Sequence, residues 1–227
     1  MSDSGSVLTR INVTTKQVTS FRLPSSETKG TSQLVVDKSN NVYGITYDWT
    51  SAMQTQTLVK IQPSTGVVTP IKSFVEDDDW VEPVYLPATN EIVGLMNDGR
   101  RLFKVNLTTK DTIGINLPGS ASAEYRELIV DNNSNLFAYK ARLKGDVSDV
   151  AKLVAVNAAT GQETILKDLP VDGKFQDNII IVPQLGGFVG SWNQSALYKI
   201  DVNSPFDLTS RSLGTGNGNT YNYFTTN

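Results

Sequence analysis

The sequence contains neither cysteine nor histidine among its 227 residues. These absences exclude a thiolate nucleophile, a Ser-His-Asp triad and a zinc site built from cysteine or histidine. Carboxylate and carbonyl oxygens remain as metal ligands, so the composition leaves a site for a hard cation such as calcium open. We therefore expect no cofactor apart from such a hard cation, and the sequence does not identify the residues that would hold it.

Charge and long apolar runs are also scarce. The net charge of −3 gives no positive surface for nucleic acid. No apolar run approaches the length of about 18 residues that marks a membrane span, so we expect no membrane insertion. The opening residues MSDSGS do not resemble a signal peptide. Charged residues make up 19% of a chain with 18 Asn and 23 Thr, a composition common in exported β-proteins, so we expect a secreted or cell-surface location.

One short pattern occurs five times. Each copy combines an apolar strand, a polar turn and a second strand, and in most copies the turn carries Thr before Lys or Gly. The copies LTRINVTTKQVTSF, LVKIQPSTGVVTPI, LFKVNLTTKDTIGI, LVAVNAATGQETIL and LYKIDVNSPFDLTS begin at Leu8, Leu58, Leu102, Leu153 and Leu197, about 47 residues apart on average. A period of this length with β signals alone is typical of propeller blades.

A second hairpin precedes each copy from the second onwards, as in LVVDKSNNVYGITY from Leu34. Two hairpins in series make a four-stranded blade. We expect full blades at about 31–75, 82–118, 126–170 and 178–213.

A fifth blade is split between the two ends of the chain. Residues 7–23 supply two of its strands, and residues 219–227 resemble one more strand. Closing the ring in this way removes exposed sheet edges. The sequence therefore predicts an all-β fold, a single β-propeller domain over 1–227 with five blades of four antiparallel strands, the fifth closed by N- and C-terminal strands. A larger propeller trimmed to this length is the alternative.

The hairpin LFKVNLTTKDTIGI resembles the outer hairpins of secreted and cell-surface β-propellers whose blades read L-Y-x-[IV]-[DN]-x-x-T-G, and the resemblance covers nearly the whole chain. In length, blade number and period the chain is also similar to five-bladed lectins of the tachylectin type. It lacks their regularly repeated Trp-containing sugar-site motif. The resemblance implies a propeller, with lectin-like carbohydrate binding as one expectation for its function.

Blade topology sorts the loops onto two faces. The hairpin turns inside each half-blade share one face, and Asp37 and Asp131 are expected to cap two of these turns. The loop between the second and third strands and the connection to the next blade share the other face, where rigid scaffolds usually carry their ligand-binding loops. The irregular segments all fall on that second face, at 46–56, 76–80, 97–100, 141–151 and 192–195.

All three tryptophans also fall on the irregular face. Tryptophan offers a flat apolar surface and one donor, which suits sugar rings, peptides and protein partners. Because the irregular loops differ from blade to blade, we expect one composite site rather than equivalent ones. The predicted ligand-binding residues are Asp48, Trp49, Asp77, Asp78, Trp80, Trp192, Asn193 and Gln194.

Each of these signals has a structural alternative. A tryptophan at a blade end also packs between neighbouring blades. The run EDDDW at 76–80 lacks the alternating D-x-[DN]-x-[DN]-G spacing of a calcium loop, which favours a solvated acidic loop. Cations recur at one place in four outer hairpins, where we expect their aliphatic stems to cover the blade while their charges reach water. These cations are Arg10, Lys60, Lys104 and Lys199.

The sequence leaves three candidate functions. The favoured one is recognition of a glycan or protein ligand without catalysis. The alternative is a structural or spacer domain of a larger polypeptide, such as a surface, fibre or secreted assembly, which the split blade favours. A glycoside hydrolase is disfavoured, because the candidate carboxylates lie mostly at strand ends or in connections. Those candidates are Asp37, Glu82, Glu127, Asp131 and Asp177.

We accordingly predict that the chain is not an enzyme and has no catalytic residues. The sequence leaves open the ligand, the oligomeric state and glycosylation at the four N-x-[ST] positions, Asn12, Asn106, Asn132 and Asn193.

Overall fold

The computed structural model describes residues 7–12, 14–23, 29–48, 55–75, 80–96, 99–118, 123–142, 151–169, 175–182, 187–192, 196–201 and 208–212. After residue 169 the description covers the backbone without side chains.

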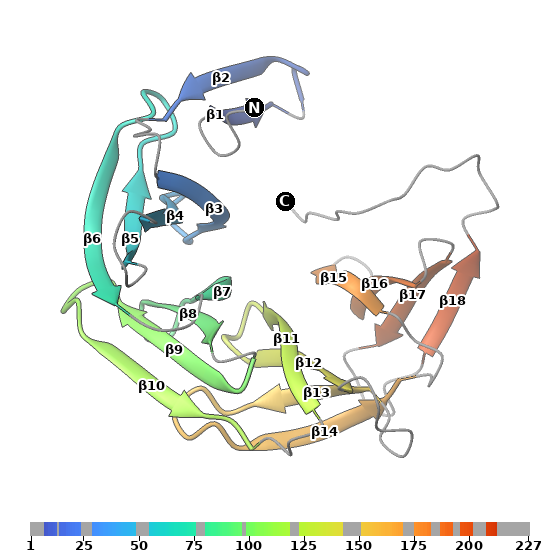
Figure 1. Ribbon diagram of the computed structural model, residues 1–227. Coiled ribbons are helices and arrows are strands. Elements are labelled where there is room, and N and C mark those ends of the chain that lie inside the picture. Colours follow the sequence, from blue (N-terminus) through green and yellow to red (C-terminus); the bar gives the residue numbers. More distant parts are fainter. Residues whose placement is uncertain are drawn as a thin grey trace. The chain divides into compact units, whose positions relative to one another are not determined.

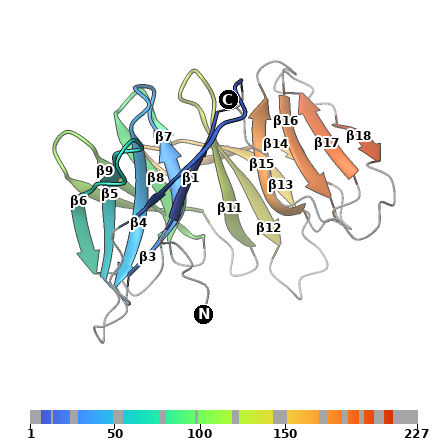
Figure 2. The same cartoon turned by 90° about the horizontal axis from the view of Figure 1, so that it is seen from above.

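The described residues form strands joined by short turns, with no helix, and hence with no helix that is long and apolar enough to cross a membrane. Figures 1 and 2 show the strands of each sheet side by side in chain order. A two-stranded sheet contains β1 (Val7–Ile11) and β2 (Val18–Arg22). Four further sheets have four strands each.

The first two four-stranded sheets contain β3 (Lys29–Val36), β4 (Val42–Asp48), β5 (Thr55–Ile61) and β6 (Val68–Val75), then β7 (Val81–Leu86), β8 (Glu91–Met96), β9 (Arg101–Asn106) and β10 (Thr112–Asn116). The other two contain β11 (Ala123–Val130), β12 (Leu136–Arg142), β13 (Lys152–Val156) and β14 (Glu163–Asp168), then β15 (Phe175–Val182), β16 (Gly187–Trp192), β17 (Ala196–Asp201) and β18 (Leu208–Ser212). The repeated four-stranded antiparallel sheet confirms the all-β prediction, whereas the number of five blades stays a prediction.

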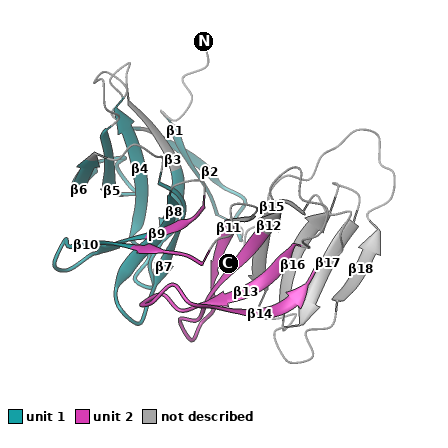
Figure 3. Ribbon diagram, turned by 60° about the horizontal axis from the view of Figure 1, so that its bottom comes forward, with its two compact units in different colours: residues 1–97, 103–114 teal, residues 98–102, 115–227 magenta. Residues whose placement is uncertain are grey.

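The chain divides into two compact units, coloured separately in Figure 3. Unit 1 comprises residues 1–97 and 103–114, and unit 2 comprises residues 98–102 and 115–227. The predicted closing strand at 219–227 lies outside the described residues. The single-domain boundary and the split fifth blade therefore stay predictions.

The outer-hairpin turns share one pattern of hydrogen bonds and backbone conformation. Asn106 shows it: its Oδ1 accepts hydrogen bonds from the backbone N–H groups of Thr108 and Thr109, at 2.8 and 3.0 Å. Asn12 and Asn157 make the equivalent bonds in their own turns. Each of four turns then places one residue in the left-handed region, namely Lys16, Gly66, Lys110 and Gly161, with φ of 58, 74, 65 and 76°. Asparagine side chains thus cap these turns through hydrogen bonds to nearby backbone groups.

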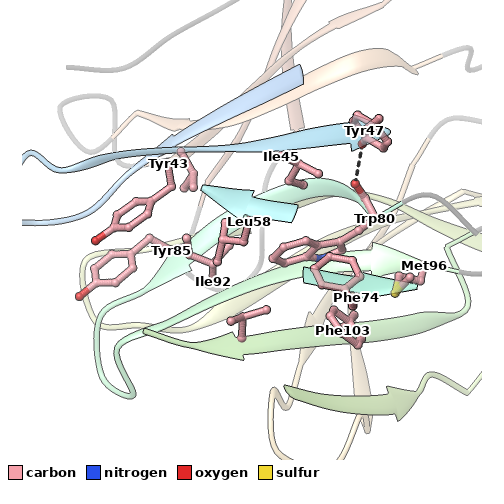
Figure 4. Close-up of a cluster of buried hydrophobic side chains, with 12 residues drawn as sticks. Tyr43, Ile45, Tyr47, Leu58, Phe74, Trp80, Tyr85, Ile92, Met96 and Phe103 are labelled. Atoms are coloured by element: carbon pink, nitrogen blue, oxygen red, sulfur yellow. Dashed lines mark hydrogen bonds between the residues drawn. The ribbon is translucent and has the colours of Figure 1, made fainter. Parts of the chain in front are cut away.

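The main core of unit 1 lies between the sheets β3–β6 and β7–β10 and centres on Trp80 (Figure 4). The indole is fully buried, and its centroid lies 5.5 Å from that of Phe74 and 5.6 Å from that of Phe103, both in edge-to-face geometry. Such pairs add about 0.5–1.5 kcal/mol to the burial of the rings. A smaller cluster, Val59 and Ile61 with Leu23, lies on the opposite face of β3–β6.

Gly94 on β8 provides the space that Trp80 occupies. A Cβ atom at this position would lie 1.9 Å from the indole Nε1. No side chain fits at that distance unless the ring or the strand moves.

We predict that Gly94→Ala destabilises the fold, because the added methyl overlaps the Trp80 ring. Overpacking of this kind costs about 1–3 kcal/mol, and more where the core resists repacking. Urea unfolding of the variant measures the effect. The matched control is Gly114→Ala, at an exposed position of β10, which should unfold near the wild-type midpoint. Equal midpoints for the two variants would contradict the packing argument.

Candidate binding site

Two irregular segments leave the β3–β6 sheet at the same end. The register aligns Asp48 at the end of β4 with Thr55 at the start of β5, and Thr55 with Val75 at the end of β6. Asp48, Thr55 and Val75 therefore lie in one row across the sheet. The segment 49–54 connects the first two of these residues, and the segment 76–79 follows the third. This row of strand ends is called the loop end of unit 1 below.

Trp80 ends the second of these segments and is held by residues that flank the first. The backbone N–H of Trp80 donates to Gln56 Oε1 at 2.8 Å. Its carbonyl accepts from the Tyr47 hydroxyl at 3.0 Å (Figure 4). Tyr47 and Gln56 are direct cross-strand partners on β4 and β5, and both are buried. One buried pair thus fixes the anchor points of both irregular segments, and we call it the Tyr47–Gln56 clamp.

The structure gives Trp80 the packing role, not the ligand-contact role. Its relative exposure is 0%, and its Nε1 has neither solvent nor a hydrogen-bond partner. The prediction that Trp80 contacts a ligand therefore does not hold in this structure, because Phe74, Phe103 and Gly94 enclose the ring. Its importance to the site is indirect, through the two segments that it anchors.

The other predicted residues lie at strand ends or beyond them. Asp48 is half-buried at the end of β4. Trp192 ends β16, where the register places it opposite Ala196 at the start of β17. The structure thus brings Asp48 to the loop end of unit 1 and Trp192 to the corresponding strand end in unit 2. The remaining predicted residues lie outside the described part of the chain; they are Trp49, Asp77, Asp78, Asn193 and Gln194.

The opposite end of unit 1 carries a buried polar network around Asp37. The carboxylate accepts hydrogen bonds from the backbone N–H groups of Ser39 and Asn41, the Asn41 side chain and the Tyr43 hydroxyl, at 2.7 to 3.0 Å. Burial opposes the charge, but these bonds outweigh it and lower the pKa of Asp37. Burial and then the bond to Asp37 raise the pKa of Tyr43 to about 12.

The networks around Asp37 and Asp131 are structural turn caps, as predicted. Asp131 accepts from the backbone N–H groups of Asn133 and Asn135 and from the Asn135 side chain, which repeats the Asp37 pattern. No group of three or more acidic residues among the described side chains could hold a metal ion. The acidic segment 76–79 lies outside the described residues, so calcium binding by this segment stays untested.

Sequence reasoning missed a strained position on the first strand of three sheets. Gln33, Glu82 and Glu127 adopt positive φ, at 47, 53 and 49°, where the register of β3, β7 and β11 shifts. Within unit 1 the Glu82 N–H donates to Gln33 Oε1 at 2.9 Å. Non-glycine residues rarely hold this conformation unless their surroundings enforce it. The sequence signal was a Gln or Glu directly before a short apolar run.

One recurring cation departs from its predicted role. Lys60 is exposed, as expected, but Lys104 is buried and its Nζ lies 3.4 Å from Glu91 Oε2. Thr89 donates to the same oxygen at 2.7 Å. A buried cation needs such a partner because desolvation is costly. The expectation that these ammonium groups reach water is therefore wrong for Lys104.

Unit 2 contains a partly buried network centred on Glu163. Its carboxylate accepts from the Tyr125 hydroxyl and, at 2.8 Å, from Lys140 Nζ, which also lies 5.2 Å from the centre of the Tyr125 ring. The Tyr125 hydroxyl oxygen also lies 2.8 Å from the Pro118 carbonyl oxygen, so its one proton has two acceptors within reach. Burial, followed by the bond to Glu163, raises the pKa of Tyr125 well above its usual value. A phenol held in its neutral form is suited to structure rather than to proton transfer.

Comparisons of sequence do not show a family. No protein-family model matches the chain. The chain is 31% identical over 80 residues to the dephospho-CoA kinase of Streptococcus thermophilus (strain ATCC BAA-250 / LMG 18311), a match that covers 34% of this chain and 39% of the kinase. That share is too small to show a family.

Comparisons of structure show the fold. Similar structures include an oligogalacturonate lyase in complex with manganese (15% identity, TM-score 0.66, 90% of this chain and 59% of that chain) and a nidogen/laminin complex (11%, 0.62, 91% and 75%). A third is the PQQ-bound aldose sugar dehydrogenase of Streptomyces coelicolor (13%, 0.58, 91% and 75%). The chain has a β-propeller-type fold. It spans less than two thirds of the lyase chain, and the tachylectin-type likeness stays a prediction.

The same neighbours correct one prediction. The lyase and the dehydrogenase are enzymes with the fold of this chain, which contradicts our prediction that the chain is not an enzyme. That prediction rested on the missing histidine and cysteine and on the scattered carboxylates. At 15% and 13% identity, the neighbours assign no reaction to this chain.

The network around Asp37 predicts a loss of stability at high pH. The pKa of Tyr43 is about 12 in the folded chain against 10.0 in the unfolded one, so the folded state retains the phenolic proton longer. Its contribution is fully present below pH 10 and is lost as the pH rises towards 12. We expect Tyr43→Phe to lose less stability than wild type between pH 9 and about 11.5, as measured by urea unfolding. Each protein's own value at pH 8 is the control, and parallel losses would contradict the assignment.

Proposed function

We propose that the chain is a recognition module that binds a glycan or protein ligand through the segments 49–54 and 76–79 at the loop end of unit 1. The observation that carries the proposal is the Tyr47–Gln56 clamp, which holds Trp80, at the end of the segment 76–79, to two residues near the ends of the segment 49–54. Segments with fixed ends lose less conformational freedom when a ligand orders them, so less binding free energy is spent on that ordering.

The residues of these segments suit recognition. Trp49 directly follows Asp48, the last residue of β4, so the sequence has an aromatic residue and a carboxylate at adjacent positions. A sugar ring stacks on an indole while its hydroxyls donate to carboxylates, and a protein partner uses the same ring as an interface anchor. Asp77 and Asp78 would add acceptors from the second segment.

Unit 2 presents its own candidate at the corresponding strand end. Trp192 ends β16, and Asn193 and Gln194 begin the connection to β17. These residues offer one aromatic surface and two amides, and their part in binding is tested separately from that of unit 1. The similarity to a nidogen/laminin complex gives support to a protein ligand, and a secreted or cell-surface location remains part of the proposal.

A structural or spacer domain is the second candidate function. The observation in its favour is the complete burial of Trp80, because a spacer uses its tryptophans for packing. The two functions differ in what they expect of Trp49 and Trp192, which can be measured.

We predict that Trp49→Ala abolishes or strongly weakens ligand binding while the unfolding midpoint stays near wild type. A glycan array with and without millimolar calcium, followed by titration of the best ligand, provides the measurement; a pull-down with extracellular matrix proteins covers the protein class. Trp192→Ala is measured in parallel and tests whether the candidate residues of unit 2 contribute to binding. Lys38→Ala, at an exposed turn on the opposite end of β3–β6, is the control that should bind as wild type. Large destabilisation by both Trp variants, with no ligand found, would favour the spacer.

The clamp gives a further test that touches no ligand-contact residue. Tyr47→Phe removes the hydrogen bond to the Trp80 carbonyl, so the segment 76–79 loses one of its two fixed points. We predict a several-fold loss of affinity for the ligand found with wild type, at a stability cost of about 1 kcal/mol. Tyr85→Phe is the matched control, because this buried tyrosine donates to Asn90, away from Trp80. Equal losses of affinity in the two variants would mean that the clamp does not position the site.

A further inference from the structure

Two backbone hydrogen bonds within unit 2 hold the residues Gly99 and Arg100. These residues precede β9, at the end of the irregular segment 97–100, and belong to unit 2 (Figure 3). The Gly99 carbonyl accepts from the Tyr125 N–H at 2.9 Å, and the Arg100 carbonyl accepts from the Leu117 N–H at 2.8 Å. The backbone from which the Arg100 side chain projects is therefore fixed by the residue that follows β10 and by a residue of β11.

Gly99 makes this close approach possible. Its φ is 72°, and a Cβ atom at this position would lie 2.0 Å from the backbone oxygen of Tyr125. A residue with a side chain would be strained in this conformation and would overlap the neighbouring backbone. The sequence Gly99-Arg100 thus places an arginine where two elements of unit 2 meet.

The guanidinium of Arg100 has no partner. The side chain is partly buried, and its Nε is covered by protein without a hydrogen-bond partner, whereas the two terminal nitrogens are not covered in this way. Among the described residues, none forms a hydrogen bond or an ion pair with this group. A buried donor without an acceptor is rare in native proteins. It is more costly in a cation than in a neutral group, so this arginine calls for an anionic partner.

The neighbouring described side chains do not supply that partner. Lys140 Nζ lies 3.4 Å from the carbonyl oxygen of Pro118 and 2.8 Å from Glu163 Oε1. The same Glu163 carboxylate accepts from the Tyr125 hydroxyl. One carboxylate therefore serves a lysine and a tyrosine, and together with Arg100 these groups carry two positive charges and one negative charge.

We propose that Arg100 anchors a binding site in unit 2 for the carboxylate group of a ligand. The terminal nitrogens of a guanidinium donate in parallel to the two oxygens of a carboxylate, and both groups are planar, which gives the pair its strength and its specificity. A bound carboxylate would also balance the excess positive charge of the groups described above. The site lies in unit 2 and does not depend on the proposed binding by the segments 49–54 and 76–79.

Nuclear magnetic resonance of the Arg100 Nε–H group tests the proposal. Because Nε is covered, its proton should exchange slowly enough to be observed, and its signal is assigned by its loss in Arg100→Gln. The full-length chain is titrated with glucuronate and with N-acetylaspartate amide, which represent a sugar source and a peptide source of the carboxylate. Glucose, and sodium chloride at equal ionic strength, are the control titrants. We expect a saturable shift with a carboxylate, with a dissociation constant on the order of millimolar for one charge-assisted pair.

Arg10→Gln is the matched control variant, because it makes the same chemical change at an exposed arginine of β1. Followed through the backbone amides of Gly99 and Leu117, it should bind as wild type does, and Arg100→Gln should bind at least about tenfold more weakly. The carboxylate that binds more tightly identifies the source. Equal responses to carboxylates and to chloride, no response to either carboxylate, or equal affinities of Arg100→Gln and wild type would overturn the proposal.

Asp98 is the internal alternative to a ligand. It precedes Gly99 in the sequence and lies outside the described residues. If its carboxylate pairs with Arg100 in solution, Asp98→Asn would bind glucuronate while wild type would not. That result would overturn the proposal and assign Arg100 to an internal ion pair.

Urea unfolding separates a binding residue from a structural one. Arg100→Met removes the charge and keeps an unbranched side chain. Without a carboxylate we expect this variant to unfold at or above the wild-type midpoint, because it no longer desolvates an unpaired cation. Glucuronate should then raise the midpoint of wild type and not that of the variant. A clearly lower midpoint for Arg100→Met would show that the guanidinium is a structural contact, which would overturn the proposal.

Discussion

The packing of Trp80 is the constraint on which the rest of unit 1 depends. The indole fills the space between two sheets because Gly94 has no side chain, and its own backbone is held by Tyr47 and Gln56. Burying a ring of this size contributes several kcal/mol, which exceeds the cost of leaving its Nε1 without a partner. The same residue thus joins two sheets and fixes the end of an acidic segment.

The two ends of the β3–β6 sheet differ in what their buried hydrogen bonds hold in place. At the turn end, each carboxylate oxygen of Asp37 accepts two hydrogen bonds, so this carboxylate is used by the turn itself. At the loop end, two buried polar bonds go to the backbone of Trp80. Structural hydrogen bonds at one end and anchored loops at the other are what a scaffold for recognition requires.

The sequence was informative where structure is local and repeated. The strand period and the caps at Asp37 and Asp131 all depend on residues within a few positions of one another, so spacing alone predicted them. The burial of Trp80 depends on Gly94 and Phe103, which lie in other strands, and no local pattern distinguishes a tryptophan that packs from one that binds. Lys104 was misjudged for the same reason, because its partner Glu91 lies on the neighbouring strand. The positive φ of Glu82 likewise reflects a strand bulge enforced by tertiary contacts.

Catalysis and recognition make different demands on the strained first-strand positions. A catalytic carboxylate needs a raised pKa and room for a reacting group, whereas Glu82 sits where its backbone N–H is already bonded to Gln33. The strain at this position therefore has a structural cause, the close pairing of two bulges, before any chemical one is invoked. The lyase and dehydrogenase neighbours show that the fold accommodates catalysis, so the decision rests on side chains rather than on topology. In unit 1, the described carboxylates of Asp37 and Glu91 are engaged in turn capping and in the ion pair with Lys104, which is why we place the proposed recognition at the loop end.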